Sequence, residues 1–336
     1  MQEKILELKA HTLFAVSRFA RKNKALHQSR IETCLALQAK ATSPIPSRQP
    51  DKLPTLQADE VTPERFLEAS QNYTLPVLLK GLVKDAISTQ TWSLDYFIDN
   101  YGSAVYTGAA KANIEPTAIR AVLEDIKKSK DSPLYDHYFA GITQIFEDYP
   151  RLKKEMGLDR LLAIIGEADE SAFKGFDLCM GSDATGSSMH CAMAGNFFNN
   201  IVGRKEWILI SPEHTRYLLP LAGDPFLFAH AYFDAGNPDL NSFTQRVPHY
   251  KVVLEPGDVL FNASWWWHCV KNLERFNVGC AVRFPRLGAD FANNFLFMLL
   301  SDLPMVIARE IKAQLTQSRL KPSAELVKEP DPVKNF

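Results

Sequence analysis

Short alternating runs of apolar and polar residues dominate the segment from about residue 173 to residue 285. Alternation with a period of two is typical of strands that bury one face. Turn signals, among them Gly203 and Pro256-Gly257, separate several of these runs. The predicted strands are 176–180, 187–193, 197–202, 205–211, 250–254, 258–262, 265–270 and 278–284. Eight short strands in about 110 residues predict a double-sheet jelly roll or a barrel.

Helical patterns lie on both sides of this β-rich segment. Apolar residues such as Ile5 and Leu8 recur at roughly helical spacing between basic residues, so residues 1–40 are predicted to be helical. Four prolines in residues 41–58 favour a linker. A short strand is predicted within 75–81, and further helices at 118–128, 158–165, 291–300 and 305–314.

These patterns divide the chain into four parts. The predicted boundaries give a helical segment with its linker (1–58), a mixed α/β lead-in (59–172), a jelly-roll core (173–287), and C-terminal helices with a tail (288–336).

Composition narrows the classes of function. The chain has 336 residues, with 38 Lys+Arg against 39 Asp+Glu, and a net charge of -1 gives no reason to expect nucleic acid as a partner. No run approaches the roughly 20 apolar residues that a membrane-spanning helix needs. The first residues do not resemble a secretory signal, so a cytoplasmic protein is expected. Five scattered cysteines without a CxxC pair predict reduced, buried thiols.

Two histidines stand at positions that a jelly roll can bring together. His190 lies in a predicted strand near the beginning of the β-rich segment, and His268 in one near its end. Two imidazoles that face each other inside the roll could hold Fe(II), Zn(II) or Cu(II). Three further histidines are expected in or near loops, either at the surface or on the substrate side of the site: His214, His230 and His249. Three residues could either line the entrance to the substrate site or have a purely structural role: Tyr135, His137 and Tyr138.

The residues around these histidines resemble a known family. The run from Ser187 to Pro212, and Pro256-Gly-Asp-Val-Leu-Phe followed by Trp266-Trp-His, resemble the core of the cupin-like JmjC oxygenases. Within that family, the run also resembles the asparaginyl hydroxylase that inhibits hypoxia-inducible factor. The resemblance covers roughly residues 60–290. It implies a double-stranded β-helix that uses Fe(II), 2-oxoglutarate and O2.

The resemblance also assigns roles to individual residues. His190 and His268 match the two iron-ligating histidines, and Lys205 matches the lysine that pairs with the distal carboxylate of 2-oxoglutarate. Ser187 and Asn196 match residues that line the cofactor pocket. A dianion buried beside a metal needs a cation at its far end. Without the family context, Lys205 would be interpreted as a turn residue in water.

Arg283 is a further candidate for the cofactor site. It lies on the strand after His268, where relatives place a basic residue that binds 2-oxoglutarate. A salt bridge is the alternative role for its guanidinium.

Ala192 is where the sequence departs from the oxygenase pattern. The position two residues after the first histidine carries Asp or Glu in the oxygenases, and side chains at i and i+2 share one face of a strand. Here a methyl group stands in that place, while Cys191 is expected to point to the opposite face. Asp177 and Asp183 lie too far along the chain for the usual arrangement.

Three interpretations of this departure remain open. His-Xaa-Ala is similar to the pattern of Fe(II)/2-oxoglutarate-dependent halogenases, in which chloride or bromide takes the vacant position and the halogen is transferred to an aliphatic carbon. The second is a hydroxylase with a two-histidine site and water in the vacancy. The third is a non-catalytic JmjC-like binding protein. Halogenation is our leading hypothesis, because Lys205 and Asn196 remain beside both histidines.

Partners follow from the same resemblance. The expected substrate is a small molecule or a group held on a carrier protein, for which the basic N-terminal helix would suit an acidic carrier. The helices from residue 291 to 314 resemble the family's dimerisation helices, which predicts a homodimer.

Overall fold

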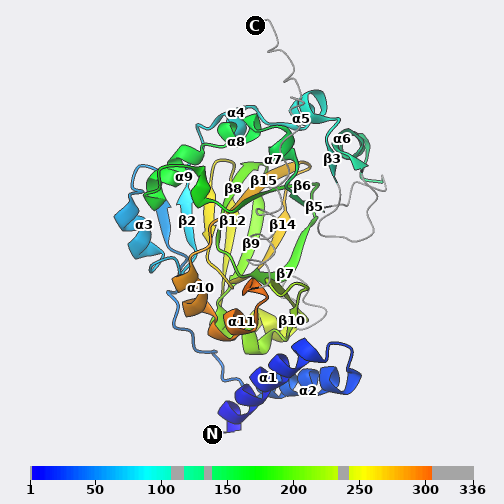
Figure 1. The fold of residues 1–336 in the computed structure, drawn as a ribbon, viewed down its shortest axis with the longest axis vertical. Helices are drawn as coiled ribbons and strands as arrows, with labels where there is room; N and C mark the ends of the chain where they lie inside the picture. Colours follow the sequence, from blue (N-terminus) through cyan, green and yellow to red (C-terminus); the bar gives the residue numbers. More distant parts are fainter. Residues whose placement is uncertain (1, 107–116, 132–137, 234–241, 305–336) are drawn as a thin grey trace, which may run out of the picture.

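The centre of the molecule is a pair of β-sheets, seen in Figure 1. The computed structural model describes residues 2–106, 117–131, 138–233 and 242–304. All eight predicted core strands are present: β6 (Gly175–Gly181), β7 (Gly186–Ala192), β8 (Asn196–Val202), β9 (Lys205–Ile210), β12 (His249–Leu254), β13 (Val259–Asn262), β14 (Trp267–Asn272) and β15 (Asn277–Arg283). β14 begins two residues later than predicted, because Trp265 has a φ of 59°, outside the range of extended backbone.

The core strands are distributed over two sheets. One sheet has the order β1-β2-β13-β8-β15-β6-β5, and the other the order β10-β11-β7-β14-β9-β12. The chain therefore crosses between the sheets repeatedly, as in a double-stranded β-helix, which confirms the predicted jelly roll. Additional strands extend the sheets or form a separate pair: β1 (Thr55–Gln57), β2 (Val77–Lys80), β3 (Val105–Tyr106), β4 (Thr117–Ala118), β5 (Tyr138–Ile142), β10 (Pro220–Ala222) and β11 (Phe228–Ala231).

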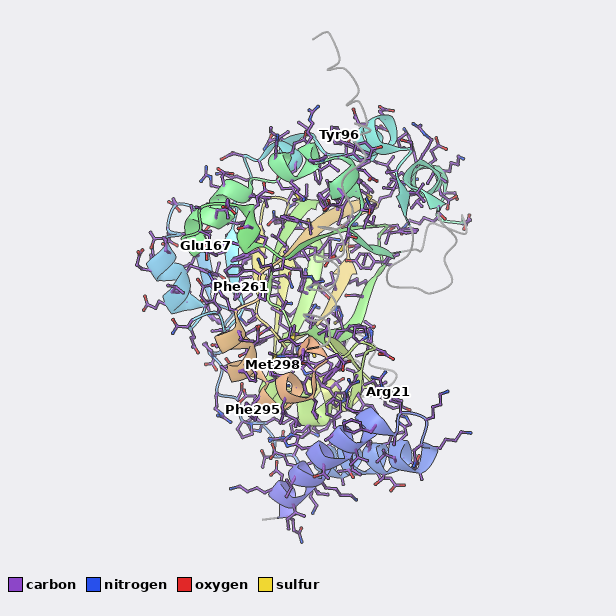
Figure 2. All side chains as sticks on the ribbon, in the orientation of Figure 1. Arg21, Tyr96, Glu167, Phe261, Phe295 and Met298 are labelled. Atoms are coloured by element: carbon purple, nitrogen blue, oxygen red, sulfur yellow. The ribbon has the colours of Figure 1, made fainter. Side chains whose placement is uncertain are left out.

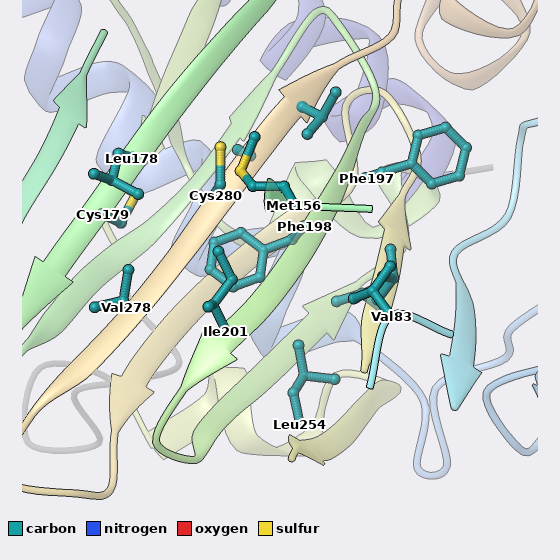
Figure 3. Close-up of a cluster of buried hydrophobic side chains, with 14 of the residues drawn as sticks. Val83, Met156, Leu178, Cys179, Phe197, Phe198, Ile201, Leu254, Val278 and Cys280 are labelled. Carbon is teal, nitrogen blue, oxygen red and sulfur yellow. The ribbon is translucent and has the colours of Figure 1, made fainter. Parts of the chain in front are cut away.

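Strand β8 shows how the sequence builds both sides of a sheet. Phe197 packs on Phe66 of helix α3, with ring centroids 5.6 Å apart. Its neighbour Phe198 points the other way and packs on Trp207 of the opposite sheet, at 4.9 Å. Figure 3 shows Phe197 and Phe198 extending to different sides of this strand. Because both faces are covered by apolar groups, six of the seven residues of β8 are buried.

Short helices cover the sheet that contains β8. Thr62 caps α3 by accepting a hydrogen bond from the amide of Arg65. The predicted helices at 118–128 and 158–165 are also present within one residue of their limits. The helices of this part are α3 (Pro63–Ala69), α4 (Ile87–Thr91), α5 (Leu94–Tyr101), α6 (Ile119–Lys128), α7 (Ile145–Asp148), α8 (Arg151–Glu155) and α9 (Leu158–Ile165).

The N-terminal helices α1 (Gln2–Phe19) and α2 (Lys24–Lys40) form a hairpin at one end of the roll (Figure 1). Phe14 of α1 stacks on Phe297, with centroids 4.9 Å apart, and Arg18 forms an ion pair with Asp302. Phe297 belongs to the pair α10 (Leu287–Asn293) and α11 (Phe295–Leu300), which lies next to the hairpin that carries Arg21 in Figure 2. The predicted helix at 305–314 lies outside the described residues.

Three other predictions can be compared with the structure. All five cysteines are buried and free, as predicted. None of the helices in the described ranges is both long and apolar enough to cross a membrane. β1 lies inside the segment predicted as a linker, so that segment is partly ordered in the sheet. The four-part division of the chain stays a prediction.

Candidate active site

His190 and His268 lie side by side on neighbouring antiparallel strands. β7 pairs with β14 so that His190 stands directly opposite His268. The centroids of the two rings are 4.2 Å apart. Both side chains line a cavity of about 430 Å³ whose walls come from the two sheets. The structure therefore has the juxtaposition that the sequence predicts.

Each of the two imidazoles is oriented by a backbone carbonyl two residues before it. Nδ1 of His190 is 2.8 Å from the oxygen of Ser188, and Nδ1 of His268 is 2.9 Å from that of Trp266. When Nδ1–H donates, the lone pair lies on Nε2, which is the tautomer of a metal ligand. Burial, followed by the neighbouring His190, holds the pKa of His268 well below its usual range, so this ring is neutral at physiological pH. Trp207 stacks on it.

Ala192 lines the same cavity, at the position where the oxygenase pattern has a carboxylate. Cys191 points to the other face and is buried in a separate apolar cluster, as predicted. In the described part of the chain, no group of three or more His, Cys, Asp and Glu side chains could hold a metal ion. The protein thus presents two imidazoles and a methyl group.

Lys205 is a fully buried cation. Gly203, with a φ of 72°, turns the chain between β8 and β9, and the side chain of Lys205 is 0% exposed. Its Nζ donates to Oδ1 of Asn272 at 2.6 Å and lies 5.5 Å from the ring centroid of Tyr138. Burial lowers the pKa of Lys205 to about 8. The alternative prediction of a turn residue in water is wrong.

Two polar side chains predicted to line the cofactor pocket do line this cavity. Asn196 is buried, and its Oδ1 has no hydrogen-bond partner among the described residues. An amide can present either its oxygen or its nitrogen to a ligand, so this group is suited to a polar ligand in the cavity. Ser187 lies opposite Val270, next to a shift in the register of β7 and β14.

Arg283 is engaged in an ion pair. Its Nε is 2.6 Å from Oδ2 of Asp177, and both residues line the cavity. The structure thus shows the salt bridge that was the alternative to direct cofactor binding. Asp177 is distant from His190 in sequence but reaches the cavity from β6, in the opposite sheet.

Several side chains lie where sequence reasoning does not place them. His230 is in β11 rather than a loop, directly opposite His190, with ring centroids 5.9 Å apart. Phe228 of the same strand stands opposite Ala192 and lines the cavity. β11 has four residues, which are too few for an alternating pattern to predict a strand. His214 is buried, whereas His249 is exposed as predicted.

Tyr138 also lines the cavity, from β5. The indole that stacks on His268 is that of Trp207, while Trp266 stacks on Tyr250. Tyr135 and His137 lie outside the described residues.

Comparison with known proteins gives a family and several relatives. A family model described as a cupin-like domain matches residues 63–285. Lysine-specific demethylase 8 of Danio rerio is 28% identical over 229 residues, which cover 63% of this chain and 53% of the relative. tRNA wybutosine-synthesizing protein 5 of Gallus gallus is 25% identical over 258 residues, or 69% of this chain and 77% of the relative. JmjC domain-containing protein D of Dictyostelium discoideum is 26% identical over 159 residues, or 45% of this chain and 36% of the relative.

The chain spans about half the length, or less, of several curated relatives that it matches. The matched family region contains every residue that lines the cavity described above.

Proposed function

The chain belongs to the family of cupin-like domains, and from this premise we propose that it is an Fe(II)- and 2-oxoglutarate-dependent oxidoreductase that halogenates an aliphatic carbon. The observation that carries the proposal is Ala192 beside His190 and His268, with no carboxylate grouped with the two rings in the described part of the chain. A halide ion would take the position that the carboxylate leaves.

The residues of the cavity fit the two cofactors. His190 and His268 would hold the iron, since their Nδ1 atoms are directed to backbone carbonyls. Lys205 would pair with the far carboxylate of 2-oxoglutarate, and Asn196 would hydrogen-bond the ligand. When bound, iron and 2-oxoglutarate supply the activation of O2 and the removal of hydrogen from a C–H bond. The protein would position the substrate carbon and the halide.

The charge of the cavity favours one additional monoanion. Arg283 and Asp177 line the cavity and offset each other's charge, while Lys205, whose Nζ lies 5.5 Å from the ring centroid of the lining residue Tyr138, adds one positive charge. Both imidazoles would be neutral as metal ligands, so the side chains contribute a single positive charge. Fe(II) adds two positive charges and 2-oxoglutarate two negative ones. The remaining positive charge is balanced by one chloride or bromide ion, and uncompensated charge in a buried site is costly.

Apolar side chains near the vacancy favour an aliphatic substrate. Met193, Ala194, Leu227 and Phe228 line the cavity on this side. A small molecule is favoured over a carrier-bound group, because part of the basic charge on α1 is engaged: Arg18 pairs with Asp302.

Anaerobic absorption spectroscopy tests the proposal. Protein is mixed with Fe(II) and 2-oxoglutarate, and the charge-transfer band is followed with and without chloride. We expect a chloride-dependent shift of the band in the wild type. In Ala192→Asp, the new carboxylate should tighten Fe(II) binding by about 10-fold or more and abolish the effect of chloride.

Ala194→Asp is the matched control, because Ala194 lines the same cavity but is not the position two residues after His190. It should keep the chloride response. A band that ignores chloride in the wild type contradicts halogenation and favours a hydroxylase with a two-histidine site. The absence of any band favours a non-catalytic binding protein.

One observation supports hydroxylation as the second candidate. The ring of His230 lies near that of His190. The described residues contain no group of three such side chains arranged to hold a metal ion, so His230 would have to move to reach iron, where it would occupy the position assigned to halide. Under the leading proposal, His230→Ala leaves Fe(II) affinity and the chloride response unchanged. A large loss of Fe(II) affinity in this variant would support a three-histidine site instead.

A further inference from the structure

A second cavity, of about 420 Å³, lies between the N-terminal hairpin and the jelly roll. Its walls come from α1, α2, the segment after α2, the 3-10 helix at Pro212–Tyr217, and α10 with α11. It shares no lining residue with the cavity of His190 and His268. Nothing in the proposed iron chemistry uses this second cavity.

Arg30 of α2 is the buried cation of this cavity. It is 7% exposed and lines the cavity. Its Nη2 donates to the backbone oxygen of Pro220, and its guanidinium lies 5.5 Å from the ring centroid of Phe14. None of the ion pairs in the described residues includes Arg30. A buried guanidinium whose partners are a carbonyl and a ring keeps an uncompensated charge.

The other arginines of the cavity already have acidic partners. Arg48 lies 3.4 Å from a carboxylate oxygen of Glu213, and Arg216 lies 2.9 Å from one of Glu7. Glu213 also accepts from the hydroxyl of Ser47. Among the arginines that line this cavity, Arg30 is therefore the one whose positive charge is not paired with a carboxylate of the described residues.

The remaining wall is largely apolar. Phe14, Leu219, Phe297 and the indole of Trp266 contribute to it. A cavity of a few hundred Å³ with an apolar wall and one placed charge is typical of a site for a small organic ligand.

We propose that this cavity is a second ligand site, which binds a small monocarboxylate with an apolar body, its carboxylate paired with Arg30. A carboxylate matches the planar fork of a guanidinium and brings one negative charge for the one positive charge. A phosphate monoester would bring nearly two negative charges and leave one of them uncompensated. The apolar body of the ligand would contact Phe14 and Trp266.

Calorimetric titration of the full chain with 4-phenylbutyrate tests this site. We expect saturable binding of one equivalent to the wild type, and at least about 10-fold weaker binding of the neutral analogue 4-phenylbutan-1-ol, because charge-assisted hydrogen bonds are lost. Arg30→Gln should weaken binding of the acid by about 10-fold or more. Arg65→Gln is the matched control, since this arginine is exposed on α3, and it should leave affinity unchanged.

Two further variants locate the bound acid. Ala10→Phe introduces a ring into the wall of the cavity without touching Arg30 and should abolish binding. Lys205→Met removes the buried cation behind Tyr138 in the wall of the other cavity and should leave binding of 4-phenylbutyrate unchanged. The proposal is wrong if the wild type shows no saturable binding, if the alcohol binds as tightly as the acid, or if Lys205→Met rather than Ala10→Phe removes binding.

Discussion

A buried lysine makes the stability of the ligand-free protein depend on pH. Burial lowers the pKa of Lys205 to about 8, whereas an unfolded lysine titrates near 10.4. Between these values the unfolded chain holds a proton that the folded chain has lost, so the contribution of Lys205 to the unfolding free energy becomes more favourable as pH rises. Below about pH 8 both states are protonated, and the cost of burying the charge is at its maximum.

Comparison with Lys205→Met isolates this contribution. The difference in unfolding free energy between wild type and variant should shift in favour of the wild type by about 3 kcal/mol from pH 7.5 to pH 10.5. Urea unfolding of both proteins at several pH values measures the shift. A constant difference across that range would mean that Lys205 stays charged in the folded protein.

Lys205 and Arg283 should differ in their effect on 2-oxoglutarate. Lys205 contacts a neutral amide, whereas Arg283 is paired with Asp177. Lys205→Met should therefore raise the Kd of 2-oxoglutarate by about 100-fold or more, and Arg283→Gln by less than about 10-fold. Calorimetry with Mn(II) in place of Fe(II) gives both values, and the double variant Asp177→Asn/Arg283→Gln controls for the unpaired carboxylate. An equal loss in the two single variants would make Arg283 a direct ligand of the cofactor.

The sequence predicts the identity of the site residues better than it predicts their contacts. His190, His268, Lys205 and Asn196 could be found because they lie in runs whose order resembles a known family. The pairing of Arg283 with a specific acid could not, because Asp177 lies 106 residues away in sequence, on the neighbouring strand β6, and no local pattern encodes which strands pair.

At the scale of elements, the N-terminal hairpin depends on a few aromatic contacts. Phe14 is buried between Phe297, at 4.9 Å, and Phe226, at 5.7 Å between ring centroids. Phe14→Ala should cost about 3 kcal/mol or more, and the loss should appear as release of the hairpin from the roll. Trypsin cleavage at Arg21 and Lys22, followed by mass spectrometry, should become faster.

Phe19→Ala is the control for this prediction, because Phe19 is on the same helix but 89% exposed. It should leave the cleavage rate unchanged. Equal acceleration in both variants would show that the hairpin is not held by Phe14. Binding of 2-oxoglutarate should be unaffected in either variant, since the hairpin does not line that cavity.

The strands that the sequence predicts and those that it misses differ physically. Core strands such as β8 and β15 have seven residues each, six of them buried, and their apolar residues form a local pattern. β11 has four residues, and its place at the edge of β7 is set by pairing with a distant strand. For this reason Phe228, which stands opposite Ala192, and His230, which stands opposite His190, became visible only in the fold.

At the scale of the whole molecule, an apolar strip on α10 and α11 supports the proposed homodimer. Phe291, Phe295 and Leu299 follow one another at intervals of four residues, and the rings of the first two lie 6.0 Å apart. Phe295 and Leu299 are each 65% exposed. A self-complementary strip of this kind suits a two-fold interface, in which the same residues meet from both copies.

Leu299→Glu should therefore convert a dimer into a monomer, because two carboxylates would be buried against each other at the two-fold axis or against apolar groups. Light scattering coupled to size-exclusion chromatography measures the mass of the protein in solution. The measurement is made at about 50 µM protein, a concentration at which a dimer with a micromolar Kd is populated. Leu8→Glu is the matched control: Leu8 is also exposed, at 68%, but lies on α1, and this variant should remain dimeric. A monomeric wild type would contradict the strip as a dimer interface. A dimer that dissociates in Leu8→Glu but not in Leu299→Glu would also contradict it and would place the interface elsewhere on the molecule.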